Sequence, residues 1–265
     1  MRAMTMSTIA CAIALTATAL AQGQAPAGGR GAGAAPPAGG QGRGGGPQTP
    51  QAAAPIDLTG TWVSIVNEDW RWRMVTPPKG DYASVPLNAE ARKVADAWDP
   101  STDGSCHAYG AAGLMRIPTR LDITWENPTT LRIDTDAGQQ TRRLLFAATQ
   151  IPDGPPTLQG HSVAEWERAG GGRGGRGGAA AGGTLKVVTT RMRGGWLRKN
   201  GVPYSEGAVL TEYFDRFPAP TGEEWMVVTS IVSDPKYLTA DFITSTHFRK
   251  EPDRSRFAPA PCRAG

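Results

Sequence analysis

The chain has 265 residues, of which 34 are glycine and 22 are proline, and its formal net charge is +4. The positive charge comes from five arginines near the N-terminus or in a glycine tract, Arg2, Arg30, Arg43, Arg173 and Arg176. Removing these five from the 28 basic residues leaves 23 against 24 acidic residues. The rest of the chain is therefore near neutral, which excludes the large basic surface typical of nucleic-acid-binding proteins.

The N-terminal segment has the pattern of a secretory signal. Arg2 precedes a short apolar run, residues 9–20, and Ala19-Leu20-Ala21 offers an Ala-x-Ala cleavage site. The run is too short, and too rich in threonine and alanine, to span a bilayer. Cys11 lies inside the run, which argues against a lipoprotein. We therefore predict that residues 1–21 are a signal peptide, that nothing inserts stably in a membrane, and that the protein is periplasmic or secreted.

Two tracts of low complexity divide the chain. Residues 22–55 consist almost wholly of Gly, Ala, Pro and Gln, and such a segment cannot bury enough apolar surface to fold, so we predict a disordered linker. Residues 169–183 have the same composition but interrupt a region rich in strands, which indicates an expanded hairpin loop. The folded body is predicted to be one domain, residues 56–250, followed by a C-terminal tail, residues 251–265.

Cys106 and Cys262 are the two cysteines that remain if the signal peptide is removed. In an oxidising compartment two cysteines commonly form a disulfide, which would tie the C-terminal tail to the loop after the first helix. The alternative is a pair of free thiols. His107 adjoins Cys106, but two cysteines without a nearby histidine pair do not make a zinc site.

The first part of the body contains one predicted helix. A strand is expected over residues 57–66, then an aromatic segment, residues 70–74, and a turn at Pro77-Pro78-Lys79-Gly80. Residues 87–98 place their apolar side chains on one helical stripe, with Asn88 as a capping residue. A long loop then leads to the next strand.

The remainder of the body alternates between apolar and polar residues, which predicts a succession of strands. These lie at residues 120–125, 131–134, 141–148, 161–167, 184–192, 208–217, 224–232 and 242–249. We therefore predict an all-β fold, an antiparallel β-barrel of about 8–10 strands with one helix between the early strands, because closure removes exposed sheet edges. A two-sheet sandwich is the alternative.

The start of the first strand carries a Gly-x-Trp motif, Gly60-Thr61-Trp62. It resembles the opening of lipocalins and their relatives. The resemblance implies a lipocalin-like barrel in which Trp62 plugs the closed end and a basic residue from a late strand packs over it. Gly60 and Trp62 would then be structural residues.

Several longer phrases resemble a second family, which consists of uncharacterised exported proteins of environmental proteobacteria and acidobacteria. The matching phrases are GHSVAEWE at residues 160–167, TLKVVTT at 184–190, PYSE at 203–206, Glu212 with Arg216, and DPKY at 234–237. The resemblance implies export and a lipocalin-like barrel, and it implies no settled activity. This chain departs from the family pattern where a short Gly-Asp turn is expanded into the glycine tract, and where Tyr213 replaces the arginine that follows the glutamate.

The sequence contains no nucleophile elbow, phosphate loop, zinc-protease motif or dinucleotide fingerprint, so we predict no cofactor and no metal. Its candidates for acid–base catalysis are His161, Glu212, His247 and Tyr204. An imidazole and a carboxylate that both point into a barrel lumen would form an acid–base pair at neutral pH. The structural alternative for each histidine is a hydrogen bond to a loop or a carbonyl group.

Residues 210–217 carry a charged group beside an aromatic on each face of a predicted strand. Glu212 and Arg216 share one face, whereas Tyr213 and Asp215 share the other. Glu212 is either a carboxylate base or half of a structural ion pair. Arg216 is either an anchor for an anionic ligand or the residue that stacks on Trp62 at the barrel floor, and we favour the stacking role.

The chain has eight tryptophans against six phenylalanines. Aromatic walls suit a cavity that holds a planar ligand, although ordinary core packing accounts for most tryptophans. Our candidates for ligand contacts are Trp70, Trp72, Trp125, Trp196 and Arg216, with Trp70, Trp72 and Trp196 at the barrel mouth.

Three hypotheses of function follow. The first is an exported barrel that binds a small apolar or aromatic molecule in its lumen. The second is a cofactor-free lyase, hydratase or isomerase that uses lumen histidine and glutamate side chains, and the third is a structural protein of the cell envelope. A lumen packed solid with side chains would count against the first two. The sequence leaves the oligomeric state open.

Overall fold

The structure, a computed structural model, describes residues 48–103, 106–146, 150, 152–168 and 182–263. The predicted signal peptide, most of the predicted linker and nearly all of the glycine tract lie outside these residues. Residues 48–55, at the end of the predicted linker, lie against the barrel. There, Trp166 Nε1 donates to Pro50 O at 2.9 Å and Arg168 Nη2 donates to Ala53 O at 3.1 Å.

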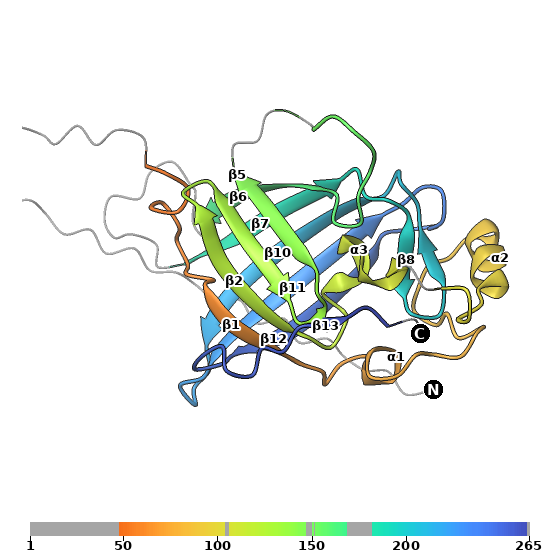
Figure 1. The fold of residues 1–265 in the computed structure, drawn as a ribbon, viewed down its shortest axis with the longest axis horizontal. Helices are drawn as coiled ribbons and strands as arrows, with labels where there is room; N and C mark the ends of the chain where they lie inside the picture. The colour runs from red at the N-terminus through yellow and green to blue at the C-terminus, as the bar shows by residue number, and fades with distance from the viewer. Residues whose placement is uncertain (1–47, 104–105, 147–149, 151, 169–181, 264–265) are drawn as a thin grey trace, which may run out of the picture. The chain divides into compact units, whose positions relative to one another are not determined.

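Nine strands close into a barrel (Figure 1). In chain order they are β1 (Gly60–Ile65), β2 (Arg120–Asn127), β3 (Thr130–Thr135), β5 (Thr141–Phe146), β6 (His161–Arg168), β7 (Gly183–Thr190), β10 (Val209–Pro218), β11 (Glu224–Ser233) and β12 (Phe242–Lys250). Around the barrel the order is β1-β12-β11-β10-β7-β6-β5-β3-β2. The barrel closes because β1 pairs with β2 on one side and with β12 on the other, placing Trp62 opposite both Leu121 and Lys250.

The predicted all-β barrel is confirmed, and the sandwich alternative is wrong. The prediction of a wholly antiparallel barrel is also wrong, because β5 and β6 are parallel, with Leu144 opposite Ser162. Parallel neighbours require a crossover in place of a hairpin, and here the crossover occupies residues 147–160. The alternation of residues cannot distinguish these two connections, since it defines the faces of a strand but not its direction relative to its neighbour.

The barrel interior is filled by apolar side chains over much of its length. Trp62, Leu121, Ile133, Phe214 and Phe248 are each at most 1% exposed and belong to one continuous core. They lie on inward-facing positions of the strands, as the two-residue period requires. This part of the barrel is therefore a packed core.

More elements cover one end of the barrel than the single helix that the sequence predicts. They are α1 (Trp70–Arg73), α2 (Ala89–Ala97), the 3-10 turn η1 (His107–Tyr109), α3 (Ala111–Leu114) and a hairpin of β8 (Gly195–Arg198) and β9 (Val202–Tyr204). Figure 1 shows α2 and β8 beyond the ends of the barrel strands. A second buried cluster joins Leu210 and Phe242 of the barrel to Ala91 of α2 and Val202 of β9. These elements therefore seal the barrel mouth.

The predicted helix is present as α2 and has the predicted cap. The Asn88 side chain accepts a hydrogen bond from Ala91 N at 2.9 Å, which satisfies one of the free amides of the first turn. The extended backbone of Trp98 ends the helix. No helix in the described part of the chain is both long and apolar enough to cross a membrane.

The predicted disulfide is confirmed, since Cys106 and Cys262 are bonded across 156 residues of sequence. The C-terminal segment that the bridge holds contains β13 (Ala260–Pro261), which pairs in parallel with β4 (Ala137–Gly138). The C-terminal segment is thus fixed to the capped end of the barrel.

Replacing Cys262 by serine should lower the free energy of unfolding by about 2–5 kcal/mol, because the open chain has more unfolded conformations to lose. Equilibrium unfolding in urea, without reductant, measures this change. Wild-type protein purified without reductant should react with less than one equivalent of a thiol reagent after unfolding. Two reactive thiols would contradict the oxidised bridge.

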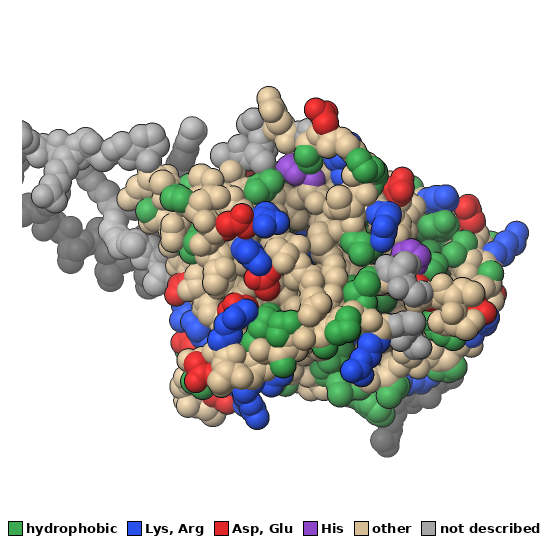
Figure 2. All heavy atoms as spheres, in the orientation of Figure 1, with side chains coloured by type: hydrophobic (Ala, Val, Ile, Leu, Met, Phe, Trp, Pro, Cys, Tyr) green, Lys and Arg blue, Asp and Glu red, His purple; other side chains and the backbone are tan. Residues whose placement is uncertain are grey.

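Basic and acidic side chains are interspersed over the face formed by β2, β3 and β5 (Figure 2). Several are paired, including Arg143 with Glu126 at 2.8 Å and Arg132 with Asp134 at 2.9 Å. Charge on this face is therefore balanced locally, as the near-neutral composition of the body predicts.

Candidate functional site

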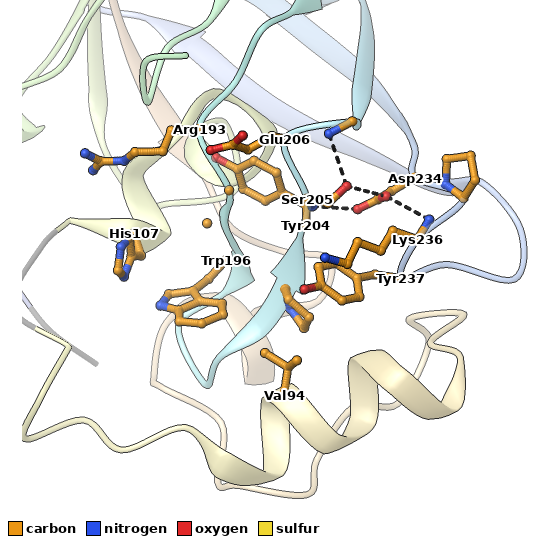
Figure 3. Close-up of a pocket in the computed structure, with 15 residues that line it drawn as sticks. Val94, His107, Arg193, Trp196, Tyr204, Ser205, Glu206, Asp234, Lys236 and Tyr237 are labelled. Atoms are coloured by element: carbon orange, nitrogen blue, oxygen red, sulfur yellow. Dashed lines mark hydrogen bonds between the residues drawn. The ribbon is translucent and has the colours of Figure 1, made fainter. Parts of the chain in front are cut away.

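A pocket lies at the capped end of the barrel, outside the packed interior. It has a volume of about 730 Å³ and is bounded by α2, the β8–β9 hairpin and the loop that follows β11. We call it the mouth pocket. Figure 3 shows Val94 of α2 and the rings of Trp196, Tyr204 and Tyr237 around it. Three aromatic rings and an aliphatic side chain give it walls suited to an apolar ligand.

The β8–β9 hairpin sets the position of two of these rings. Gly195 pairs with Tyr204, and Trp196 pairs with Pro203. A Cβ atom at Gly195 would lie 2.6 Å from His107 O and 2.8 Å from Tyr204 Oη, so only glycine allows this close approach. The sequence indicates only a break in the strand at residues 194–195. In the structure, Gly195 allows the hairpin to pack closely against η1.

Asp103 orients one wall of the mouth pocket. Its carboxylate accepts hydrogen bonds from Trp98 Nε1 at 3.0 Å and Trp196 Nε1 at 2.9 Å, and lies 3.1 Å from His107 Nδ1. The His107 ring then meets the Trp196 indole edge-on, with 5.4 Å between the ring centroids. One buried carboxylate therefore holds both rings in a fixed orientation.

Asp234 orients the opposite wall. Its carboxylate accepts hydrogen bonds from Ser205 N at 2.6 Å, Ser205 Oγ at 2.8 Å and Lys236 N at 3.1 Å (Figure 3). These bonds join residues 203–206 to residues 234–237, two phrases that the family resemblance singles out. The structure thus places both phrases on one pocket, although about 30 residues separate them in the chain.

Tyr204 lies in the wall of the mouth pocket and is 1% exposed. Among the described residues, no group forms a hydrogen bond with its hydroxyl. Burial raises the pKa of the Tyr204 phenol far above its usual range. The phenol is therefore neutral at physiological pH, and a neutral phenol does not act as a general base.

Glu212, the second acid–base candidate, lies inside the barrel and is paired. Its carboxylate receives two hydrogen bonds from Arg142, at 2.6 and 3.0 Å, and both side chains are fully buried. Arg142 also donates to Thr189 Oγ1 at 3.2 Å, and Thr189 lies 2.8 Å from Ser162 Oγ. These four residues form a polar layer between the packed core and the cluster that seals the mouth. The geometry matches the structural alternative for Glu212.

The two histidine candidates lie elsewhere. His161 is 8% exposed and lines a groove of about 410 Å³ beside the parallel β5–β6 pair. His247 points away from the barrel interior, and its Nδ1 lies 2.8 Å from Glu68 Oε2. His161, Glu212, His247 and Tyr204 therefore do not converge on one site.

The basic residue above Trp62 is Lys250, whose Nζ lies 5.4 Å from the indole centroid. Trp62 is fully buried and donates from Nε1 to Leu58 O at 2.9 Å. Arg216, the residue favoured for that role, instead pairs with Glu224 at 2.8 Å. Lys250 takes the position because β12, its strand, is a neighbour of β1, whereas β12 and β11 both lie between β1 and β10.

The ligand-contact candidates are spread over the molecule. Trp125 and Arg216 both line a depression of about 630 Å³ at the end of the barrel where residues 48–55 lie. Trp70 is 63% exposed, and Trp72 donates from Nε1 to Asp81 at 3.1 Å. Of the predicted aromatic contacts, Trp196 is the one that lines the mouth pocket.

Sequence reasoning missed Val94, Asp103, Asp234 and Tyr237 as site residues. Asp234 and Tyr237 belong to a phrase that the resemblance identifies, so a signal was present for them. Val94 lies on the apolar stripe that predicts the helix over residues 87–98, and nothing in the sequence marks Asp103. No family model matches this chain, and the searches of curated proteins and of solved structures gave no match either.

Proposed function

We propose that this protein binds a small aromatic or largely apolar molecule in the mouth pocket. The observation that best supports this proposal is a pocket of about 730 Å³ whose aromatic walls are held in place by two buried carboxylates, Asp103 and Asp234. Pockets of several hundred cubic ångströms with mostly apolar linings and a few oriented polar groups are typical ligand sites. The barrel interior is filled, so we assign the ligand to the mouth.

The polar groups around the pocket favour a ligand with one hydrogen-bonding or weakly acidic group. Arg193, Lys236 and Glu206 line it beside Ser205. The Lys236 ammonium lies 5.1 Å from the Tyr237 ring centroid, which keeps a positive charge near the apolar wall. A planar molecule could therefore stack on Trp196 or Tyr237 while its polar group faces the basic residues.

The same proposal includes a lipocalin-like relationship and export. The Gly60-x-Trp62 start and Lys250 above the indole support the relationship, whereas the parallel β5–β6 pair departs from it. The Cys106–Cys262 bridge supports an oxidising compartment, such as the periplasm, in line with the predicted signal peptide. The acid–base enzyme is the weaker hypothesis, because its four candidate residues lie apart.

The binding proposal can be tested with the neutral aromatic probe N-phenyl-1-naphthylamine, whose fluorescence rises in apolar surroundings. Gly207 lines the pocket, and a Cβ atom there would lie 3.6 Å from Ser205 Oγ, an ordinary contact. The site therefore accepts a Cβ atom, and we expect the indole of Gly207→Trp to occupy the pocket. We expect the wild type to bind the probe and this variant to bind it about tenfold more weakly or worse.

Val209→Trp is the matched control, because Val209 is two residues away and 36% exposed on the barrel surface. It should bind the probe as the wild type does. Equal affinity in the Gly207→Trp variant, with both variants folded by circular dichroism, would place the probe elsewhere and overturn the assignment. Absence of binding by the wild type would count against an apolar ligand.

A further inference from the structure

A separate cluster of three buried arginines is contributed by α1, the segment after α3, and β8, and none of the three lines the mouth pocket. Arg73 of α1, Arg116 after α3 and Arg198 of β8 are 6%, 6% and 4% exposed. All three line one small cavity of about 20 Å³, which we call the guanidinium cavity. Its other walls include Trp72, Ile117, Leu197 and Lys199. The Lys199 ammonium lies 5.3 Å from the Tyr109 ring centroid.

Five nitrogen atoms of these arginines have no hydrogen-bond partner among the described residues. They are Arg73 Nη2, Arg116 Nη1 and all three side-chain nitrogens of Arg198. Buried polar groups are almost always hydrogen-bonded, and an unpaired buried charge is among the costliest arrangements in a protein. Five unpaired donors around one cavity therefore mark a place where a hydrogen-bond acceptor belongs.

Of the three arginines, one has no bonded carboxylate. Arg73 pairs with Glu68 at 2.7 Å, and Arg116 pairs with Asp69 at 2.9 Å. A third carboxylate, Asp81, is bonded to the more exposed Arg71 at 2.6 Å. Arg198 has no such partner in the described part of the chain.

The Arg198 guanidinium lies instead against two aromatic rings, 4.8 Å from the Trp72 centroid and 6.0 Å from that of Phe242. Burial, and next the neighbouring Arg116 charge, lower the pKa of Arg198 to about 10. The group therefore remains protonated at neutral pH. A cavity with surplus positive charge calls for an anion.

The size of the guanidinium cavity restricts that anion. About 10–15 Å³ of cavity volume holds one water-sized occupant, so 20 Å³ suits a single small ion and excludes a phosphate ester or a long carboxylate. The apolar walls also favour a weakly hydrated ion. We propose that the guanidinium cavity binds one halide ion, chloride in practice, which pairs with Arg198 and also contacts Arg73 and Arg116.

The first test is thermal unfolding of the full chain in sodium chloride and in sodium gluconate at equal ionic strength, since gluconate is too large for the cavity. Chloride should raise the melting temperature by about 3–5 °C over gluconate at roughly ten times its dissociation constant. The Arg198→Gln variant should lose this difference. Arg71→Gln should retain it, because Arg71 lies over the same indole at 5.2 Å but is 62% exposed and bonded to Asp81.

The second test needs no variant and therefore stands if Arg198→Gln does not fold. Crystals of the wild type grown or soaked in sodium bromide should show an anomalous scattering peak between the three guanidinium groups. Identical melting in chloride and gluconate, or a cavity without an anomalous peak in bromide, would overturn the proposal. Chloride-dependent melting that survives in Arg198→Gln would assign the ion to a different site.

Discussion

Replacing Glu212 by glutamine should lower the free energy of unfolding by about 3–5 kcal/mol. The substitution leaves the Arg142 guanidinium fully buried without a counter-charge, and that is the costly half of breaking a buried ion pair. Equilibrium unfolding in urea would measure the loss. Glu224→Gln is the matched control, because Glu224 also pairs with an arginine but is 31% exposed, so its loss should be at most about 1 kcal/mol.

A double variant separates the cost of the unpaired charge from the value of the pair. Replacing both Arg142 and Glu212 by methionine removes both charges and keeps most of the volume, so its stability should lie within about 1–2 kcal/mol of the wild type. A Glu212→Gln protein as stable as the wild type would mean that Arg142 has another route to solvent or to a partner, and would reopen a functional role for Glu212.

Trp62→Ala should destabilise the barrel by a similar amount, about 3–5 kcal/mol. Trp62 is fully buried at the seam between β1 and β12, and its removal empties a large volume and exposes Leu58 O and the Lys250 side chain to a cavity. Thermal or urea unfolding measures the change. Trp70→Ala, at a side chain 63% exposed, should stay within about 0.5 kcal/mol of the wild type. If Trp62→Ala has the same melting temperature as the wild type, the prediction that Trp62 plugs the closed end of the barrel is wrong.

The barrel strands could be predicted because their residues follow a two-residue period that separates inward-facing from outward-facing positions. Along β10, for instance, Glu212 and Phe214 are fully buried, while Tyr213 and Asp215 lie on the half-buried opposite face. The β8–β9 hairpin could not be predicted in this way. Its residues are buried on both faces by helices and loops distant in sequence, so Trp196 and its arginine neighbours show no period.

Only some residues of the candidate site could be predicted from the sequence. Alternation places His247 on the opposite face of its strand from Thr246 and Phe248, but it does not show which face points into the barrel. In the structure, His247 points outward. The partner of Glu212 lies 70 residues away in sequence, and no local pattern connects Arg142 to it. Likewise, the Asp234 bonds to Ser205 depend on how β11 and β9 meet in space.

The seam between β1 and β12 has a consequence for how the molecule is made. Trp62 pairs with Lys250, so the barrel cannot close until residue 250 has left the ribosome. Until then, β1 presents an unpaired edge to its surroundings, and such edges recruit other strands. Closure between residues so distant is also slow, since the chain must lose much entropy before the pairing forms. The nascent protein therefore passes through an open sheet with an exposed edge. A chaperone that binds incompletely folded chains at this stage would raise the yield of folded protein.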